Sequence, residues 1–162
     1  MSHAMPIALV ELVNFLREVP LLTVASVGPD GRPQAALLGV AVGDNLELVF
    51  DTLETTRKFR NVRRDPRVAF VFGKAGGYVA GKHDERTLQY EGIAEIPAGE
   101  ELKRAQDLYF GLFPDGRERL KWPHITYVRT RPVWIRFSDY NQNPPVIAEL
   151  GGEDLRKWLA SG

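Results

Sequence analysis

The feature that most constrains this fold is the shortness of the links between neighbouring β-rich segments. Residues 21–27 are followed by a Gly-Pro-Asp-Gly turn at 28–31 and a second β-rich run at 33–42. The Gly-Asp-Asn turn at 43–45 then leads directly to a third run at 46–51. Turns of this length join antiparallel strands, whereas parallel strands need a crossover of a dozen or more residues. The sequence therefore predicts hairpins and disfavours a parallel α/β fold.

The rest of the chain adds three strands and four amphipathic or capped helical segments. Apolar residues at helical spacing begin at Ile7, and Pro20 ends this predicted helix. Pro132 interrupts the last predicted strand, which indicates a sheet edge or a bulge there. About six antiparallel strands with flanking helices predict a mainly β fold, a small six-stranded barrel. The further strands are expected at 67–72, 86–96 and 125–138, the further helices at 56–64, 98–113 and 153–159, and loops at 73–85 and 114–124.

Length, charge and cysteine content exclude several classes of protein. A chain of 162 residues suits one domain spanning 1–162. Its 21 basic and 21 acidic residues give a net charge of zero, which disfavours nucleic acid as a partner. The absence of cysteine excludes disulfides, a zinc–thiolate site and a thiol nucleophile, and we expect no metal site.

The N-terminal segment carries no targeting pattern. It lacks a basic stretch followed by an apolar core, and no apolar run approaches the roughly 18 residues of a membrane span. We therefore expect a cytoplasmic protein with no membrane partner. Met5 is a second candidate start, which would make residues 1–4 a non-native addition.

Residues 46–72 hold the most informative local pattern, a strand, a Thr-rich turn, a short basic helix and another strand. Thr56 suits the N-cap of the helix, yet Arg57 and Lys58 occupy its first turn, where cations oppose the helix dipole. Hydroxyls, free backbone N–H groups and two cations at one helix start indicate a site for an anion, and above all for phosphate. A solvated basic helix face is the alternative that charge alone leaves open.

The last strand carries a second pattern. Alternation places Val133, Ile135 and Phe137 on a face suited to the core. The opposite face then holds an aromatic–arginine–aromatic arrangement made by Trp134, Arg136, Ser138 and Tyr140. Trp, Tyr and Arg are enriched at protein interfaces, so this face is compatible with a subunit interface. An arginine extended to solvent beside a half-buried tryptophan is the alternative.

A sequence motif in the basic helix and the strand after it resembles that of a known family. It consists of Thr56, Arg57, Lys58, Asn61, Pro66 and Val68, within LVFDTLETTRKFRNVRRDPRVAFVF. With GPDGRPQAALLGVAV before it and LQYEGIAEI after it, the chain resembles the pyridoxamine 5′-phosphate oxidase-like FMN-binding split-barrel family over roughly residues 21–95.

The resemblance implies a six-stranded antiparallel split barrel that forms a homodimer, with flavin mononucleotide (FMN) in each of two clefts between the subunits. It implies that Thr56, Arg57 and Lys58 hold the flavin phosphate. Phe50, Asp51 and Thr52 would then lie along the ribityl chain and the ring. Trp134 and Arg136 are cofactor-binding candidates from the last strand, whereas Asn61 and Pro66 have structural roles, with Asn61 tying the helix to its neighbour and Pro66 starting a strand.

Two departures from the family bear on the substrate. The family's second-strand arginine has no counterpart in Gln-Ala-Ala-Leu at 34–37, and its late Arg-x-His motif is absent from WIRFSDYNQNPPVI. The sequence is therefore interpreted as an FMN-binding oxidoreductase whose small-molecule substrate is not pyridoxamine phosphate. Two alternatives stay open: the same fold binding a deazaflavin cofactor or haem, and a non-enzymatic flavin- or polyanion-binding module.

Overall fold

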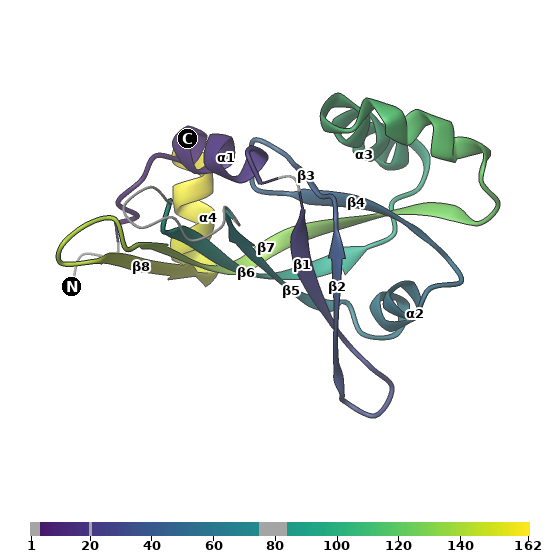
Figure 1. The fold of residues 1–162 in the computed structure, drawn as a ribbon, viewed down its shortest axis with the longest axis horizontal. Helices are drawn as coiled ribbons and strands as arrows, with labels where there is room; N and C mark the ends of the chain where they lie inside the picture. The colour runs from purple at the N-terminus through teal and green to yellow at the C-terminus, as the bar shows by residue number, and fades with distance from the viewer. Residues whose placement is uncertain (1–3, 20, 75–83) are drawn as a thin grey trace.

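The computed structural model describes residues 4–19, 21–74 and 84–162, and within them an antiparallel sheet dominates the molecule (Figure 1). The strands are β1 (Leu22–Val27), β2 (Pro33–Leu38), β3 (Ala41–Val42), β4 (Leu48–Leu53), β5 (Arg67–Gly73), β6 (Arg86–Glu95), β7 (Ile125–Asp139) and β8 (Val146–Gly151). The helices are α1 (Leu9–Arg17), α2 (Arg57–Arg64), α3 (Gly99–Leu112), the 3-10 helix η1 (Pro114–Lys121) and α4 (Gly152–Ser161).

The strands follow the order β2-β1-β5-β6-β7-β4-β3, and every pair is antiparallel. The long strand β7 joins three partners, because it pairs with β4 at its start, with β6 over most of its length and with β8 at its end. The prediction of a mainly β, antiparallel split barrel with flanking helices is confirmed. Its strand count is wrong, since the described residues contain eight strands and not six.

Two local features account for the extra strands. The run expected at 33–42 is divided into β2 and β3 at Gly39, where an added Cβ would lie 3.1 Å from the ring of Phe113. The segment that forms β8 contains Ala148, Glu149 and Gly151, which have weak strand preference, so no strand was predicted there. Its strand conformation is stabilised by pairing with β7.

A β-bulge lies in the middle of the sheet where β6 meets β7. Glu91 faces Trp134 and Gly92 faces Pro132, so Val133 is the extra residue. The irregularity expected at Pro132 is therefore confirmed, but the core position expected for Val133 is wrong. Because the bulge displaces it from the strand alternation, Val133 is 43% exposed, whereas Ile135 and Phe137 are buried as expected.

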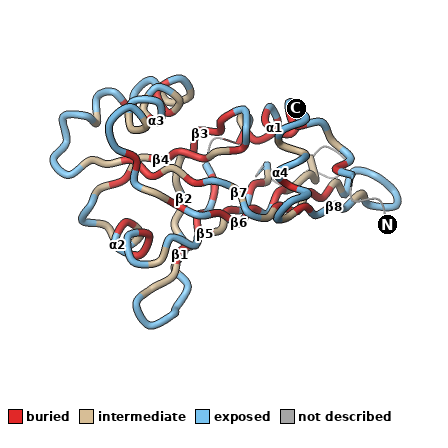
Figure 2. Tube along the Cα trace, turned by 180° about the vertical axis from the view of Figure 1, so that it is seen from behind, coloured by how far each residue is buried: buried red, intermediate tan, exposed pale blue. Residues whose placement is uncertain are grey.

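Two apolar clusters lie on opposite sides of β4. The larger one fills the barrel, packs under α1 and α4, and includes Phe50, Phe70 and Tyr90. The smaller one lies between α3 and the outer side of β4 and β7, and includes Tyr109 and Tyr127. Figure 2 shows the buried stretches along the strands, with the exposed positions in the turns and outer helix faces. Both faces of β4 are therefore covered just before the chain enters α2.

Most of the helices lie at the positions predicted from the sequence. α1 and α4 lie side by side at one end of the molecule, while α2 and α3 lie toward the other (Figure 1). The loop expected at 114–124 is wrong in part, because η1 occupies 114–121 and packs beside α3. Pro20 and most of the loop expected at 73–85 lie outside the described residues. Within the described residues, no helix is long and apolar enough to cross a membrane.

Candidate anion-binding site

Hydroxyl groups and an ammonium converge where β4 ends and α2 begins. Thr56 caps the helix, since its Oγ1 accepts a hydrogen bond of 3.3 Å from the backbone N of Phe59. The Oγ1 atoms of Thr52 and Thr56 lie 3.1 Å apart, and Lys58 Nζ donates to Thr52 Oγ1 over 2.8 Å. Three of the residues that the sequence analysis proposed for phosphate and ribityl contacts are therefore brought together.

Partial burial lowers the pKa of the ammonium in this group. The pKa of Lys58 is lowered from its ordinary value of 10.5, chiefly because partial burial disfavours the charged form, while the Asp51 carboxylate opposes this shift. The hydroxyl that this partly buried ammonium hydrogen-bonds is neutral, so it does not neutralise the positive charge. Negative charge placed beside Lys58 would therefore be favourable.

The cations of α2 differ from most other arginines of the described chain because they form no ion pair with a carboxylate. Arg17, Arg86 and Arg129, for example, each form an ion pair with a carboxylate. Over the described residues, by contrast, no ion pair forms at Arg57, Lys58, Arg60, Arg63 or Arg64. Five neighbouring cations that form no ion pair within the described residues leave a concentrated positive charge on one short helix, which favours anion binding.

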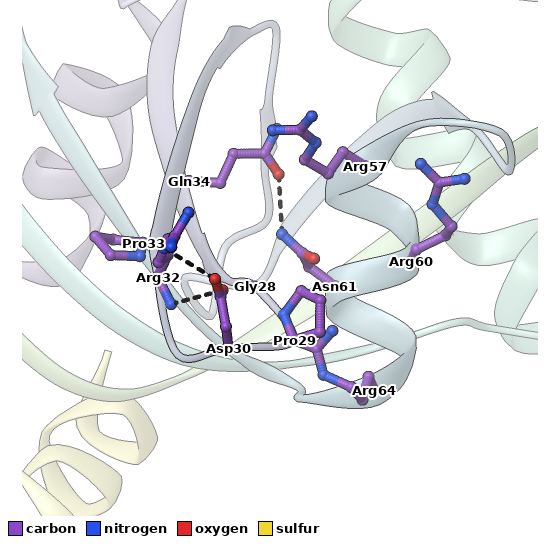
Figure 3. A pocket seen from close by; sticks show the side chains of 10 residues that line it. All are labelled: Gly28, Pro29, Asp30, Arg32, Pro33, Gln34, Arg57, Arg60, Asn61 and Arg64. Atoms are coloured by element: carbon purple, nitrogen blue, oxygen red, sulfur yellow. Dashed lines mark hydrogen bonds and ion pairs between the residues drawn. The ribbon is translucent and has the colours of Figure 1, made fainter.

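A pocket of about 680 Å³ lies between α2 and the turn that joins β1 to β2. Figure 3 shows its side chains, which come from both elements. Its polar lining includes Asp30, Arg32 and Gln34 from the hairpin, with Arg57, Arg60 and Arg64 from the helix. Of the two cations that the sequence analysis proposed as phosphate contacts, Arg57 lines this pocket. The Lys58 side chain points toward Thr52 instead.

Asn61 fixes the geometry of the pocket wall. Its buried side-chain amide donates to Ser26 Oγ over 3.1 Å and to Gln34 Oε1 over 2.9 Å, which ties α2 to β1 and β2. The structural role expected for Asn61 is therefore confirmed. Pro66 directly precedes β5, as expected, and its carbonyl accepts a hydrogen bond from the backbone N of Ala94.

The sequence analysis missed most of the pocket lining. Arg60 and Arg64 follow Arg57 at spacings of three and seven residues, so helical periodicity could have identified them on the same face. Arg32 and Gln34 come from a hairpin that is distant in sequence from α2. No local pattern in that hairpin indicates that it packs against a basic helix.

The carboxylate of Asp51 is engaged by a neighbouring element. Its Oδ2 accepts a hydrogen bond of 2.5 Å from Arg119 Nε of η1, and its Oδ1 accepts one of 3.0 Å from the hydroxyl of Tyr109 on α3. Burial and the adjacent carboxylate raise the pKa of the Tyr109 hydroxyl, so this tyrosine stays protonated and acts as a donor. Asp51 therefore anchors two helices to the end of β4.

The remaining three candidates are placed differently. The Phe50 side chain is buried in the barrel and packs against Phe70 with ring centroids 6.2 Å apart, so it contributes to the core. Trp134 and Arg136 lie in the second half of β7, whereas β4 pairs with the first half. Arg136 Nη1 donates to Glu149 on β8 over 3.0 Å. Within one chain, these residues therefore do not join the Thr52–Lys58 group.

Across the described residues, His, Asp and Glu side chains form no cluster of three that could hold a metal ion. The chemistry that the α2 region can perform is therefore recognition by cations, hydroxyls and amides. Such groups suit a phosphate or another oxyanion.

Comparison with known proteins finds a matching protein family. Residues 9–137 match the model of the family described as pyridoxamine 5′-phosphate oxidase. The pyridoxine/pyridoxamine 5′-phosphate oxidase of Burkholderia vietnamiensis is 29% identical over 147 residues, which are 86% of this chain and 64% of that protein. This chain thus spans less than two thirds of the length of that curated relative.

Solved structures show the same fold at low sequence identity. A haem-binding protein of Mycobacterium smegmatis has a TM-score of 0.75 at 15% identity, over 97% of this chain and 62% of that one. A pyridoxamine 5′-phosphate oxidase-related, FMN-binding protein of Nostoc punctiforme has a TM-score of 0.64 at 14% identity, over 90% of this chain and 89% of that one. The proteins that share this architecture thus include one described as haem-binding and one described as FMN-binding.

Proposed function

This chain belongs to the pyridoxamine 5′-phosphate oxidase family, and from that premise we propose that it binds FMN at the start of α2 and acts as a flavin-dependent oxidoreductase. The observation that carries the proposal is the group formed by Thr52, Thr56 and Lys58, flanked by the unpaired Arg57. The two hydroxyls and the two cations can all donate hydrogen bonds to phosphate oxygens. A structural relative is itself described as FMN-binding.

The residues present fit a flavin phosphate better than an uncharged ligand. Lys58 is partly buried and forms no ion pair within the described part of the chain, although the Asp51 carboxylate acts on it from a greater distance, so its ammonium would gain from a dianionic group. Bound flavin would supply hydride-transfer chemistry. The role of the protein would be to hold the phosphate, to orient the ribityl chain beside Thr52, and to shield the site from water.

A homodimer with a shared cleft is the second part of the proposal. Opposed residues of antiparallel strands face the same side of a sheet, and the register places a row of them across five strands: Leu37, Thr23, Val71, Gln89 and Arg136. A parallel row runs through Ala35, Ala25, Ala69, Glu91 and Trp134.

Exposed apolar side chains on this outer face support a partner there. Leu37 is 67% exposed and Val71 is 55% exposed, and a hollow of about 340 Å³ beside them is lined in part by Ala25 and Ile93. Contiguous apolar surface of this kind marks interaction sites. Because Trp134 and Arg136 share this face, a second copy packed on it would carry them toward the cofactor site of its partner.

The substrate in this proposal is a small molecule other than pyridoxamine 5′-phosphate. An enzyme for that substrate needs a second phosphate site near the flavin. The segment that follows β7, from Asp139 to Pro145, contains no cation, and Asp139 Oδ1 is bound by the backbone N of Asn141 over 2.9 Å. An anionic substrate would meet the Asp139 carboxylate here, and the cation opposite it on β6, Arg86, already forms an ion pair with Asp84.

An absorption spectrum of the protein after gel filtration with each cofactor tests the proposal. We expect FMN to be retained, whereas retention of haem or a deazaflavin in its place would overturn the flavin assignment. The FMN-loaded protein is then assayed with pyridoxamine 5′-phosphate and oxygen. We expect no useful formation of pyridoxal phosphate, and efficient turnover would restore that substrate.

A further inference from the structure

A carboxylate lies one residue from the hydroxyls and cations of the α2 start. Asp51 directly precedes Thr52 on β4, and its negative charge raises the pKa of Lys58 against the larger effect of burial. The same charge opposes the approach of a phosphate, because like charges repel. An anion site at the end of β4 therefore works best when the charge of Asp51 is offset.

Arg119 of η1 supplies a cation that offsets this carboxylate. Its Nε donates to Asp51 Oδ2 over 2.5 Å, and the Tyr109 hydroxyl donates to Asp51 Oδ1 over 3.0 Å. Only 22% of the Arg119 side chain and 16% of the Asp51 side chain are exposed, so solvent and salt screen this pair weakly. The second carboxylate near Arg119 belongs to Asp115, which is 77% exposed and therefore interacts more weakly with it.

We propose that Arg119 is a positioning residue for phosphate recognition, because it offsets the charge of Asp51 and leaves Arg57 and Lys58 available to the phosphate. The inference rests on the proposed FMN site and deepens it, since it names a further residue on which discrimination between FMN and riboflavin depends. Arg119 needs no contact with the flavin in this role. It acts through Asp51, from an element that is 68 residues away in the sequence.

The alternation of β4 separates this ion pair from the groups that would touch the phosphate. Neighbouring side chains of a strand point to opposite faces of the sheet. Asp51 bonds to α3 and η1 on one face, whereas Thr52 bonds to Thr56 and Lys58 on the other. A change at Arg119 therefore alters the charge beside the phosphate site and leaves its hydroxyl and ammonium donors in place.

Fluorescence titrations of charge variants with FMN and with riboflavin test this inference. Arg119→Gln should lower the ratio of FMN affinity to riboflavin affinity by about fivefold or more, because the charge of Asp51 is no longer offset. Arg119→Lys keeps the positive charge and should keep most of the ratio. Lys121→Gln is the matched control, because it removes a cation of the same helix from an exposed pair with Glu118, and it should leave the ratio unchanged.

Removal of the carboxylate separates an effect of charge from an effect of anchoring. The double variant Asp51→Asn/Arg119→Gln lacks both charges and should restore the ratio of the parent protein, whereas loss of a purely structural anchor would not be rescued. Asp51→Asn alone should not lower the ratio, and this variant tests the inference even if Arg119→Gln does not fold. A ratio that falls in Asp51→Asn, stays low in the double variant or is unchanged in Arg119→Gln would overturn the inference.

Failure of the proposed function gives a different result. If neither flavin binds, the flavin proposal is overturned, and side-chain NMR of Lys58 in the unloaded protein still tests the offset of charge. Arg119→Gln should raise the pKa of Lys58, because the Asp51 carboxylate then acts on the ammonium unopposed, and Asp51→Asn should lower it. A pKa of Lys58 that is the same in both variants would contradict the role proposed for Arg119.

Discussion

At the scale of single residues, the cationic side chains of α2 point in three directions. Lys58 reaches back to the Thr52 hydroxyl, Arg57 opens onto the pocket beside the hairpin, and Arg63 lies over the ring of Phe59 at 5.8 Å. These positions follow from the helical rotation between neighbouring residues. Equal charges on one short helix therefore have different expected roles, and substitutions can separate them.

Replacing Arg57 or Lys58 by alanine is expected to weaken FMN binding with little effect on folding. Each charge-assisted hydrogen bond contributes roughly 1.5–3 kcal/mol, so each change should cost about tenfold in affinity or more. Arg63→Ala is the matched control and should bind FMN like the parent protein. Flavin fluorescence titration and thermal melting of the unloaded variants measure the two effects, and a collapsed melting temperature would make Arg57 and Lys58 structural.

The lowered pKa of Lys58 predicts a pH dependence. The ammonium form binds phosphate, and a bound phosphate raises the pKa of Lys58 again. FMN affinity should therefore fall as pH rises through the lowered pKa of the free protein, with uptake of a proton on binding in that interval. In Lys58→Arg the charge persists, so the dependence should vanish. Affinity in the parent protein that stays constant to alkaline pH would contradict this role.

At the scale of elements, η1 and α3 are attached to β4 through one carboxylate. Asp51 binds Arg119 from η1 and Tyr109 from α3, and Arg119 Nη2 also donates to the Tyr109 hydroxyl over 3.0 Å. The group lies next to Thr52 at the edge of the smaller apolar cluster. The position of the α2 start therefore depends on an ion pair between segments that are far apart in sequence.

Arg119→Ala should lower the free energy of unfolding by about 1.5–3 kcal/mol, because it leaves a partly buried carboxylate with only the tyrosine donor. Lys121→Ala removes an exposed pair with Glu118 from the same helix and should cost less than about 1 kcal/mol. Urea denaturation of both variants provides the comparison. Similar losses in the two would show that the Asp51 pair anchors nothing.

Sequence periodicity was sufficient for elements that carry their own signals. Thr56 and Pro66 delimit α2 within the chain, and the turn residues at 28–31 and 43–45 mark the hairpins. β8 and η1 carry weaker signals, since β8 depends on pairing with β7 and η1 is joined to β4 through Arg119. Elements that depend on tertiary contacts were therefore missed.

The same distinction applies to the site. Thr56 and Lys58 are close in sequence and were grouped from the local pattern, whereas Thr52 was proposed through the family resemblance. The engagement of Asp51 by Arg119 spans 68 residues, and the hairpin side of the pocket packs on α2 through Asn61. Contacts of this range are fixed by the packing of the sheet, which no short motif encodes.

At the scale of the whole molecule, one face of the sheet remains to be covered. The rows that run from Leu37 to Arg136 and from Ala35 to Trp134 cross β2, β1, β5, β6 and β7, and they include the exposed Leu37 and Val71. Exposed sheet faces with apolar rows favour association. Since both rows end at cofactor candidates, assembly and cofactor binding are expected to be coupled.

Val71→Glu should convert a dimer into monomers that no longer retain FMN, because the charge would be buried at the centre of the proposed interface. Trp134→Glu should disturb both properties as well. Val10→Glu places the same charge on an exposed apolar position of α1, 65% exposed, and should leave both unchanged. Light scattering with detection of bound flavin measures both quantities, and a monomeric parent protein with FMN bound would refute the shared cleft.

The most direct measurement of the central claim is a paired fluorescence titration of the protein with FMN and with riboflavin. The two ligands differ only in the phosphate, so their affinity ratio isolates the contribution of the α2 start. Because that group supplies hydroxyls and cations that form no ion pair in the described chain, we predict that FMN binds at least about tenfold more tightly than riboflavin. Equal affinities would contradict the phosphate site and, with it, the proposed function.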